Sequence, residues 1–291
     1  MTTLRVLSAG PLSTVQDLGR PGFASVGVSR SGALDRAALA LANRLVGNEQ
    51  GAAGIEITVG GFSAVFDADV WIAVTGAWGP VTSAGRPIDV NHPVRLAAGE
   101  LLEIGMAEAG LRYYLAVGGG IEVPAVLGSR STDVLSGTGP AVLTDGVVLP
   151  LGSPHPESMR PVDISPWGRP DLGVVTVPLY VGPRADWFTA ASIEALFTET
   201  WTLSPASNRV GARLDGTPLE RSAVTIARGE LPSEGMVAGG IQVPPSGSPT
   251  VLLADHPTTG GYPVIAVVAS ASLDRFAQLR PGQEIRFRHG R

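Results

Sequence analysis

The close spacing of turn-forming residues restricts the fold of this chain more than any other sequence feature. Short apolar runs alternate with clusters of Gly, Pro, Asn and Asp. Glycine occupies 38 and proline 24 of the 291 positions, which leaves little room for long helices. Short strands at this spacing are typical of a barrel or sandwich, whereas strands alternating with long helices would predict a parallel doubly wound sheet. We therefore predict a mainly β chain with two barrel-like halves and a few short helices. The expected strands are Val70–Thr75, Leu111–Val117, Val174–Val181, Ala223–Ala227, Thr250–Ala254, Val264–Ala269 and Glu284–Arg288.

The clearest helical pattern runs over Leu34–Val46, where apolar residues recur at a spacing of three and four and form one stripe. We expect Ser31 to cap the start of this helix and Gly47 to end it. Two further helices are expected over Asp186–Phe197 and Leu273–Leu279.

Two similar segments suggest how the halves are arranged. Leu96–Ile104 and Leu279–Phe287 share a glycine turn that leads into an alternating strand, and each is expected to close one barrel. Between them, Leu149–Gly173 holds six prolines and few apolar residues, as an exposed connection does. These patterns predict an N-terminal half at 1–155 and a C-terminal half at 172–291.

The chain contains no cysteine, and all 21 of its basic residues are arginine. The missing cysteine excludes a thiolate nucleophile, a disulfide framework and a thiolate zinc site. The missing lysine excludes a Schiff base, a Gly-Lys-Ser/Thr phosphate loop and a covalently bound biotin. If ATP or biotin takes part, another chain must carry much of that machinery. The four histidines, His92, His155, His256 and His289, have no paired spacing, so no metal site is predicted.

No apolar run approaches the roughly 20 residues that span a bilayer, and the N-terminus lacks a leader pattern. The formal charge of −5 is spread without a basic stripe, so neither a membrane nor nucleic acid is an expected partner. We expect the protein to be cytoplasmic.

The first polar region comprises Thr14–Arg20 and Ser31–Asp35, followed on the expected helix by Asn43. Asp35 and Asn43 are eight residues apart, so on a helix their directions differ by roughly 80° and both could face one cleft. A structural alternative has Asp17 organising a turn, Arg20 paired with a carboxylate and Asp35 favoured by the helix dipole.

Three further regions are rich in glycine and polar residues: Ala116–Asp133, Ser207–Leu214, and Ser233–Pro244 together with Asp255–Pro263. In the first of them, Arg130 suits either a bound carboxylate or phosphate or a structural ion pair. The third ends in Asp255–Pro263, where hydroxyls and successive glycine N–H groups can form an anion-binding concavity or a plain turn.

Taken together, these segments resemble the signature blocks of the allophanate hydrolase subunit 2 family. The agreement is specific because many blocks occur in the expected order over nearly the whole chain. The matching blocks are Thr14–Arg20, Gly27–Asn48, Ala116–Asp133, Ser207–Leu214, Ser233–Pro244, Asp255–Pro263 and Gln278–Phe287. The sequence departs from the family pattern at Pro257, where Gln is expected, so His256 is not nominated as a base. It also has Val210 where Met is common.

The resemblance implies a cyclophilin-like β-barrel architecture and a subunit of an ATP-dependent 5-oxoprolinase, which opens 5-oxo-L-proline to L-glutamate with subunits A and B. ATP is then a co-substrate of the complex, and the chain alone is expected to be inactive. Two alternatives stay open: a biotin-dependent carboxyltransferase that acts on urea or a similar amide, and a regulatory protein that binds a kinase inhibitor.

Hydrolysis of an unstrained lactam benefits when its carbonyl oxygen is first converted into a phosphate ester, so arginines are expected to hold anions and carboxylates to manage protons. The candidate catalytic residues are Asp35, Glu234 and Arg209. The candidate substrate- or anion-binding residues are Arg20, Asn208, Arg213, Thr258, Thr259, Gly260, Gly261 and Tyr262.

Overall fold

A computed structural model describes residues 2–154, 168–227 and 229–290. The chain forms two compact units, of which the first contains Met1–Arg20 and Ser31–Pro170 and the second contains Pro21–Arg30 and Asp171–Arg291. The predicted halves, 1–155 and 172–291, did not anticipate that Pro21–Arg30 belongs with the second unit. Much of the predicted connection Leu149–Gly173, and with it His155, lies outside the described residues.

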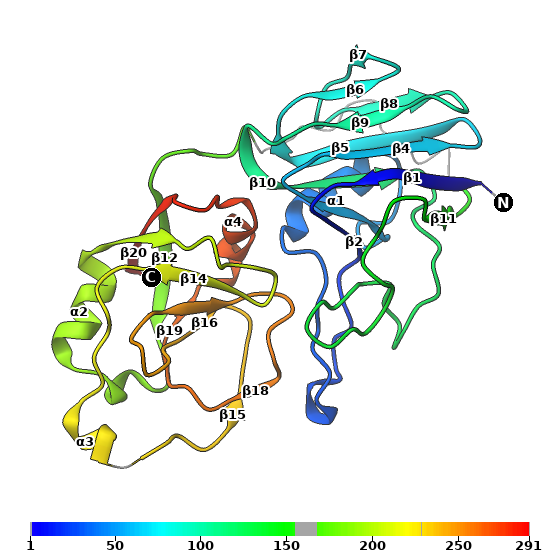
Figure 1. Cartoon of the computed structure of the whole chain (residues 1–291). Helices are drawn as coiled ribbons and strands as arrows, with labels where there is room; N and C mark the ends of the chain where they lie inside the picture. The colour runs from blue at the N-terminus through cyan, green and yellow to red at the C-terminus, as the bar shows by residue number, and fades with distance from the viewer. Residues whose placement is uncertain (1, 155–167, 228, 291) are drawn as a thin grey trace. The chain divides into compact units, whose positions relative to one another are not determined.

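The first unit is built on two antiparallel sheets (Figure 1). A six-stranded sheet has the order β11-β1-β4-β9-β6-β7, and a five-stranded sheet has the order β2-β3-β10-β5-β8. The strands are β1 Thr3–Ala9, β2 Leu12–Gln16, β3 Gly54–Thr58, β4 Phe62–Phe66, β5 Val70–Trp78, β6 Val81–Ser83, β7 Arg86–Pro87, β8 Pro93–Leu96, β9 Leu102–Ile104, β10 Ala109–Val117 and β11 Val148–Pro150.

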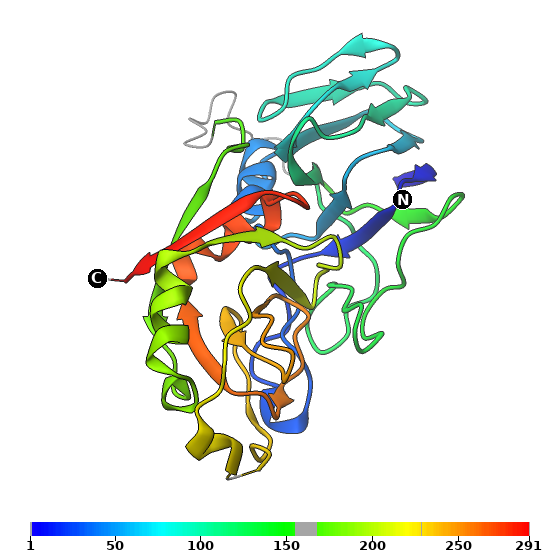
Figure 2. The same ribbon diagram turned by 60° about the vertical axis from the view of Figure 1, so that its left-hand side comes forward.

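One apolar core contains side chains from both of these sheets, including Leu4 and Phe62 from the first and Ile55, Ile72 and Leu115 from the second. Successive side chains of a strand point to opposite faces, so the strands of the second sheet also present residues to its other side. Helix α1, Arg36–Leu45, covers that other side (Figures 1 and 2).

Helix α1 packs Leu41 and Leu45 against two small strand residues, Ala73 and Ala116, which allow the helix to approach the sheet closely. The helix predicted over Leu34–Val46 is therefore confirmed. Its predicted cap is wrong, because the N-cap residue is Asp35 and not Ser31.

The actual roles of the flanking residues follow from their geometry. The Ser31 hydroxyl donates to the Thr132 carbonyl (3.2 Å). Gly47 follows the helix end as predicted, with a φ of 76° that favours glycine.

The second unit contains a closed barrel with the strand order β12-β19-β16-β17-β14-β13-β20. Closure depends on the parallel pairing of β12 with β20, so Leu279–Phe287 leads into a closing strand as predicted. The similar segment Leu96–Ile104 contributes β9, which lies inside the open six-stranded sheet and closes no barrel. The barrel strands are β12 Val175–Val181, β13 Thr200–Leu203, β14 Gly211–Asp215, β16 Gly240–Gln242, β17 Thr250–Leu252, β19 Val264–Val268 and β20 Glu284–His289.

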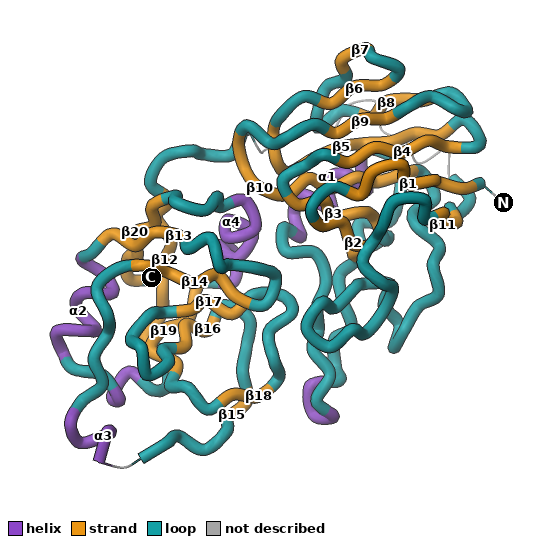
Figure 3. The backbone as a smooth tube through the Cα atoms, viewed as in Figure 1, coloured by secondary structure: helices purple, strands orange, loops and turns teal. Residues whose placement is uncertain are grey.

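A separate two-stranded ribbon, β15 Glu234–Gly235 and β18 Thr259–Gly260, also belongs to this unit (Figure 3). No helix in the described ranges is long and apolar enough to cross a membrane. The unit's helical segments are η1 Ala24–Val26, η3 Ala185–Trp187, α2 Ala190–Thr198, α3 Ala223–Ala227, η4 Ser270–Ser272 and α4 Leu273–Gln278.

The strand predicted at Ala223–Ala227 is wrong, since this β-branched run forms helix α3. Ser222 starts the turn by accepting from the Ile226 N–H, and the Thr225 hydroxyl donates to the Trp187 carbonyl (2.9 Å). Val224 and Ile226 are 64% and 65% exposed, so no sheet buries the apolar residues that suggested a strand.

Candidate functional site

The predicted site residues are divided between the two units. Arg20 and Asp35 lie in the first unit, and Asn208, Arg209, Arg213, Glu234 and the loop Thr258–Tyr262 lie in the second. Each group is described within its own unit.

Arg209 makes a fully buried ion pair with Asp255 at the start of the predicted loop. The Arg209 Nε donates to Asp255 Oδ2 (2.8 Å) and its Nη2 donates to Asp255 Oδ1 (3.0 Å). The Asp255 N–H also donates to the Arg209 carbonyl (3.1 Å). A bidentate partner therefore occupies the fork that was predicted to hold an anion, which gives Arg209 a structural role in anchoring the loop.

Asn208 and Arg213 lie on either side of Arg209, at the turn into β14 and on β14 itself. The Asn208 side-chain oxygen accepts from the backbone N–H groups of Val210 (2.9 Å) and Gly211 (3.2 Å), so it closes the turn into β14. Arg213 is exposed on β14, opposite Thr250 of β17. Anion binding by these two residues stays a prediction.

Glu234 lies beside the predicted loop, because it pairs with Gly260 in the β15–β18 ribbon. The Met236 N–H also donates to the Thr258 carbonyl (2.9 Å), which extends the contact. Glu234 forms a two-pronged ion pair with Arg184, whose Nε lies 3.1 Å from the carboxylate. These hydrogen bonds from Arg184 lower the pKa of Glu234. A carboxylate with a lowered pKa is a poor proton shuttle near neutral pH, so the pair favours a structural role.

The remaining loop residues are partly accessible. Thr259 and Tyr262 are exposed, while Gly260 and Gly261 are half-buried. An anion at this loop would lie near the Glu234 carboxylate, with the Arg184 guanidinium beside it as the compensating charge. The side chain of His256 lies close to its own backbone, with Nδ1 2.8 Å from the Pro257 carbonyl.

In the first unit, Asp35 caps helix α1, because its Oδ1 accepts from the Ala38 N–H (2.8 Å). The Asp35 N–H donates to the Tyr114 hydroxyl (2.7 Å), which in turn donates to Glu56 Oε2 (2.8 Å). Burial, followed by the charges of Glu56 and Asp35, raises the pKa of Tyr114 well above its ordinary value. This cluster fixes the start of the helix.

The sequence reasoning missed Glu56, Tyr114 and Arg112, although all three are buried. Arg112 Nε lies 3.5 Å from Glu56 Oε1, and Glu56 stands opposite Tyr114 in the β3–β10 register. A signal was present, because Glu56 is a charged residue between Ile55 and Ile57 in an otherwise apolar strand. A charge at such a position requires a buried partner.

Asp17 organises the loop Ser129–Asp133, in agreement with the structural alternative considered for it. Its carboxylate accepts from the hydroxyls of Ser129 (2.6 Å) and Ser131 (2.5 Å) and from the backbone N–H groups of Arg130 (2.6 Å) and Gly19 (2.7 Å). Four donors fill the acceptor capacity of one carboxylate, so Asp17 is a structural hub.

The two arginines next to this hub differ. Arg130 is paired with Glu122 (2.8 Å) and donates to the Val123 carbonyl (2.8 Å). Of the two predicted roles, a bound anion or a structural ion pair, Arg130 therefore forms the ion pair. Arg20 is buried and donates through Nη2 to the Ser131 carbonyl. Its Nε and Nη1 are buried and make no hydrogen bond within the described residues.

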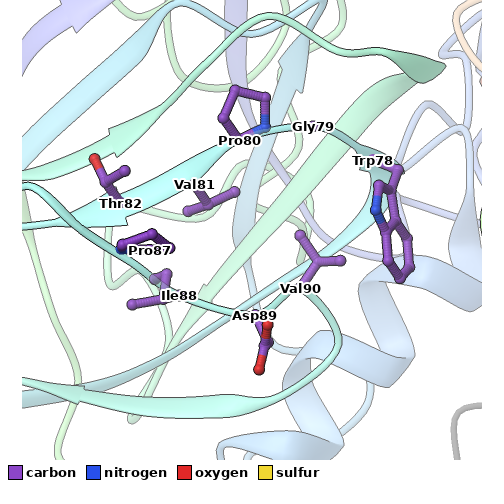
Figure 4. Close-up of a pocket in the computed structure, with 9 residues that line it drawn as sticks. All are labelled: Trp78, Gly79, Pro80, Val81, Thr82, Pro87, Ile88, Asp89 and Val90. Atoms are coloured by element: carbon purple, nitrogen blue, oxygen red, sulfur yellow. The ribbon is translucent and has the colours of Figure 1, made fainter.

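A surface depression of about 210 Å³ lies beside β6 and β7 (Figure 4). Asp89 is the only ionisable residue in its lining, and none of the sequence-predicted residues contributes to it. The depression therefore offers no arrangement for catalysis. Its lining residues are Trp78, Gly79, Pro80, Val81, Thr82, Pro87, Ile88, Asp89 and Val90.

Comparison with known proteins identifies the family. The family model "Carboxyltransferase domain, subdomain A and B" matches residues 26–289, which is most of the chain. The chain belongs to this carboxyltransferase family. The match confirms the resemblance inferred from the ordered sequence blocks.

Two relatives within this carboxyltransferase family show the range of chain lengths. The C subunit of the Escherichia coli 5-oxoprolinase is 40% identical over 98% of this chain and 90% of its own length. The urea amidolyase of Lachancea kluyveri is 35% identical over 97% of this chain, which corresponds to 16% of the much longer relative.

A solved structure confirms the fold. TTHA0988 superimposes with a TM-score of 0.89 at 35% identity over 99% of this chain. This chain spans 55% of the length of TTHA0988. The mainly β, cyclophilin-like carboxyltransferase fold is therefore shown, with one closed seven-stranded barrel and few short helices.

Proposed function

We propose that this protein is a subunit of an ATP-dependent 5-oxoprolinase, which opens 5-oxo-L-proline to L-glutamate together with subunits A and B. The observation that carries the proposal is the nearly end-to-end match to the C subunit of the Escherichia coli 5-oxoprolinase, at 40% identity over 90% of that protein. The urea amidolyase match covers only 16% of a much longer chain, so the 5-oxoprolinase relative, matched over 90% of its length, is the better counterpart.

The composition supports a shared reaction. ATP would activate the lactam carbonyl as a phosphate ester before water attacks, and phosphoryl transfer requires positive charge around the phosphates. This chain has no lysine, so a lysine-containing phosphate loop and any biotinylated lysine must come from partner chains. We expect the isolated chain to be inactive and the complex to act in the cytoplasm.

The test is reconstitution of the three subunits with ATP and 5-oxo-L-proline, followed by measurement of L-glutamate and ADP. The complex should form both products, and omission of this chain should abolish glutamate formation. An assembled complex that forms no glutamate would contradict the proposal.

A second candidate is carboxyl transfer from biotin to urea or a similar amide. The name of the family model and the urea amidolyase relatives favour it. Incubation of the assembled complex with carboxylated biotin and urea distinguishes the two candidates, because only this candidate predicts allophanate as product.

A further inference from the structure

Arg20 is a buried charge that the described part of the chain leaves uncompensated. Its side chain is 1% exposed, yet no described carboxylate forms an ion pair with it. Two of its three nitrogens, Nε and Nη1, have no hydrogen-bond partner among these residues. A guanidinium stays charged at any physiological pH, so burial in this state is costly unless an anion completes it.

Two other buried arginines of the protein are compensated. Arg209 is paired with Asp255, and Arg112 lies beside Glu56. The fold therefore supplies a carboxylate to each of these buried arginines but not to Arg20. This contrast makes Arg20 the buried arginine of the described residues that is available to an external anion.

The guanidinium of Arg20 is held in a fixed position. Its Nη2 donates to the Ser131 carbonyl, in the loop that Asp17 organises. Gly139 lies against it, since a Cβ atom on Gly139 would come within 2.9 Å of Arg20 Nη2. Such fixed geometry lowers the entropic cost of binding.

The segments that hold Arg20 also contain unpartnered acceptors. Among the described residues, Gln16 Oε1, Thr132 Oγ1 and Asp133 Oδ2 are buried without a hydrogen-bond partner. These residues belong to the same interlocked segments, because Gln16 Nε2 donates to the Thr132 carbonyl (2.9 Å) and the Thr132 N–H donates to the Val15 carbonyl (2.9 Å).

This mixture of groups selects the kind of ligand. A simple anion would satisfy the guanidinium but leave the buried acceptors unpaired. Water alone would satisfy the acceptors but leave the positive charge without a counterion. A small molecule that carries both a carboxylate and an N–H donor offers an acceptor to the guanidinium and a donor to one of the unpartnered oxygens.

We propose that Arg20 binds the carboxylate of a small amide substrate and that one of the acceptors of Gln16, Thr132 and Asp133 receives its N–H group. If the proposed function holds, that substrate is 5-oxo-L-proline, a cyclic amide with one carboxylate. The inference deepens the proposed function by assigning substrate recognition to the first unit.

Calorimetric titration of the full-length chain tests the inference without any requirement for turnover. The probes are 5-oxo-L-proline and 2-pyrrolidinone, which is the same lactam without the carboxylate, and phosphate serves as an anion without an amide. The wild-type chain should bind 5-oxo-L-proline more tightly than either control. Loss of a charge-assisted bidentate contact should weaken binding about 10- to 100-fold.

Arg20→Met should remove the preference for 5-oxo-L-proline over 2-pyrrolidinone. Its folding should survive, because a buried unpaired charge is replaced by an apolar chain of similar length. Arg130→Met is the matched control, since Arg130 lies in the adjoining loop with its own partner Glu122, and it should bind like the wild type. Arg20→Lys should restore part of the affinity, since ammonium lacks the bidentate fork.

Three results would overturn the inference: a wild-type chain that binds neither lactam, one that binds both equally, or an Arg20→Met variant that keeps wild-type affinity. Its failure is separable from failure of the proposed function. Glutamate formation by a complex that contains Arg20→Met at wild-type KM would reject the site alone. Selective binding of 5-oxo-L-proline by a chain whose complex forms no glutamate would reject the reaction alone.

Discussion

At the scale of single residues, buried arginines take different roles according to their partners. Arg209 and Asp255 are both fully buried and satisfy each other, whereas two nitrogens of Arg20 have no hydrogen-bond partner among the described residues. Removing one member of a buried pair leaves the other charge unpaired in a medium that solvates it poorly. The two sites should therefore respond to mutation in opposite ways.

Arg209→Ala should lower the free energy of unfolding by about 3–5 kcal/mol, because Asp255 is left buried and unpaired. Urea denaturation of the full-length chain measures this loss. Arg86→Ala is the matched control, since its guanidinium is 79% exposed in the pair with Glu100, and it should cost less than about 1 kcal/mol. If Arg209→Ala is as stable as the wild type but abolishes turnover in the complex, Arg209 binds substrate as first predicted.

The pair of Glu234 and Arg184 should make stability depend on pH. Arg184 lowers the pKa of Glu234 from its ordinary value of 4.5, so the folded state favours the ionised carboxylate. The pair therefore stabilises fully above about pH 4.5, and its contribution is lost as the pH falls through the lowered pKa. The gap in Tm between wild type and Glu234→Gln should be constant from pH 6 to 8 and close toward pH 3. It should also shrink in about 1 M salt, because both groups are partly exposed. A gap that widens in acid would contradict this assignment.

At the scale of elements, the start of α1 depends on strands that come later in the sequence. Tyr114 of β10 accepts from the Asp35 N–H, and Glu56 of β3 holds the Tyr114 hydroxyl. The N-cap is Asp35 instead of Ser31 because two interactions meet at Asp35. Its side chain accepts from the Ala38 N–H, and its own N–H donates to Tyr114.

Asp35→Ala should therefore destabilise the protein by about 0.5–2 kcal/mol through loss of the N-cap. Asp35→Ser should restore most of that stability, since a serine hydroxyl can also accept from the Ala38 N–H. Thermal melts of the two variants measure the cap. Turnover of the reconstituted complex then tests proton handling: Asp35→Ser should retain activity if the residue is only a cap, and should lose it if Asp35 moves a proton.

At the scale of the whole molecule, the second unit is not continuous in sequence, because it includes Pro21–Arg30. Within this unit the Ser29 hydroxyl lies 3.4 Å from the Ala254 carbonyl, next to the Arg209–Asp255 pair. A fragment that consists only of 171–291 lacks this segment.

That fragment should show faster amide hydrogen exchange at Val251–Asp255 than the same residues show in the full-length chain. The amides of β20 provide the internal control, since two strands separate β20 from β17 in the barrel order. Equal protection at Val251–Asp255 in the fragment and in the full-length chain would show that Pro21–Arg30 does not stabilise this corner.

The sequence by itself determined the fold class, helix α1 and most barrel strands, because the spacing of apolar residues and turn formers acts over a few neighbouring positions. It also determined the absence of lysine and cysteine chemistry and the family. Only the tertiary structure decided that Ala223–Ala227 is a helix and that β12 is the strand on which β20 closes the barrel. It also decided that Arg209 is paired while Arg20 has no carboxylate partner among the described residues. The physical reason is distance along the chain, since Asp255 lies 46 residues beyond Arg209 and Ser131 lies 111 residues beyond Arg20. Local pattern fixes backbone conformation and the buried face of an element, but the partner of a buried charge depends on which distant segments the topology brings together.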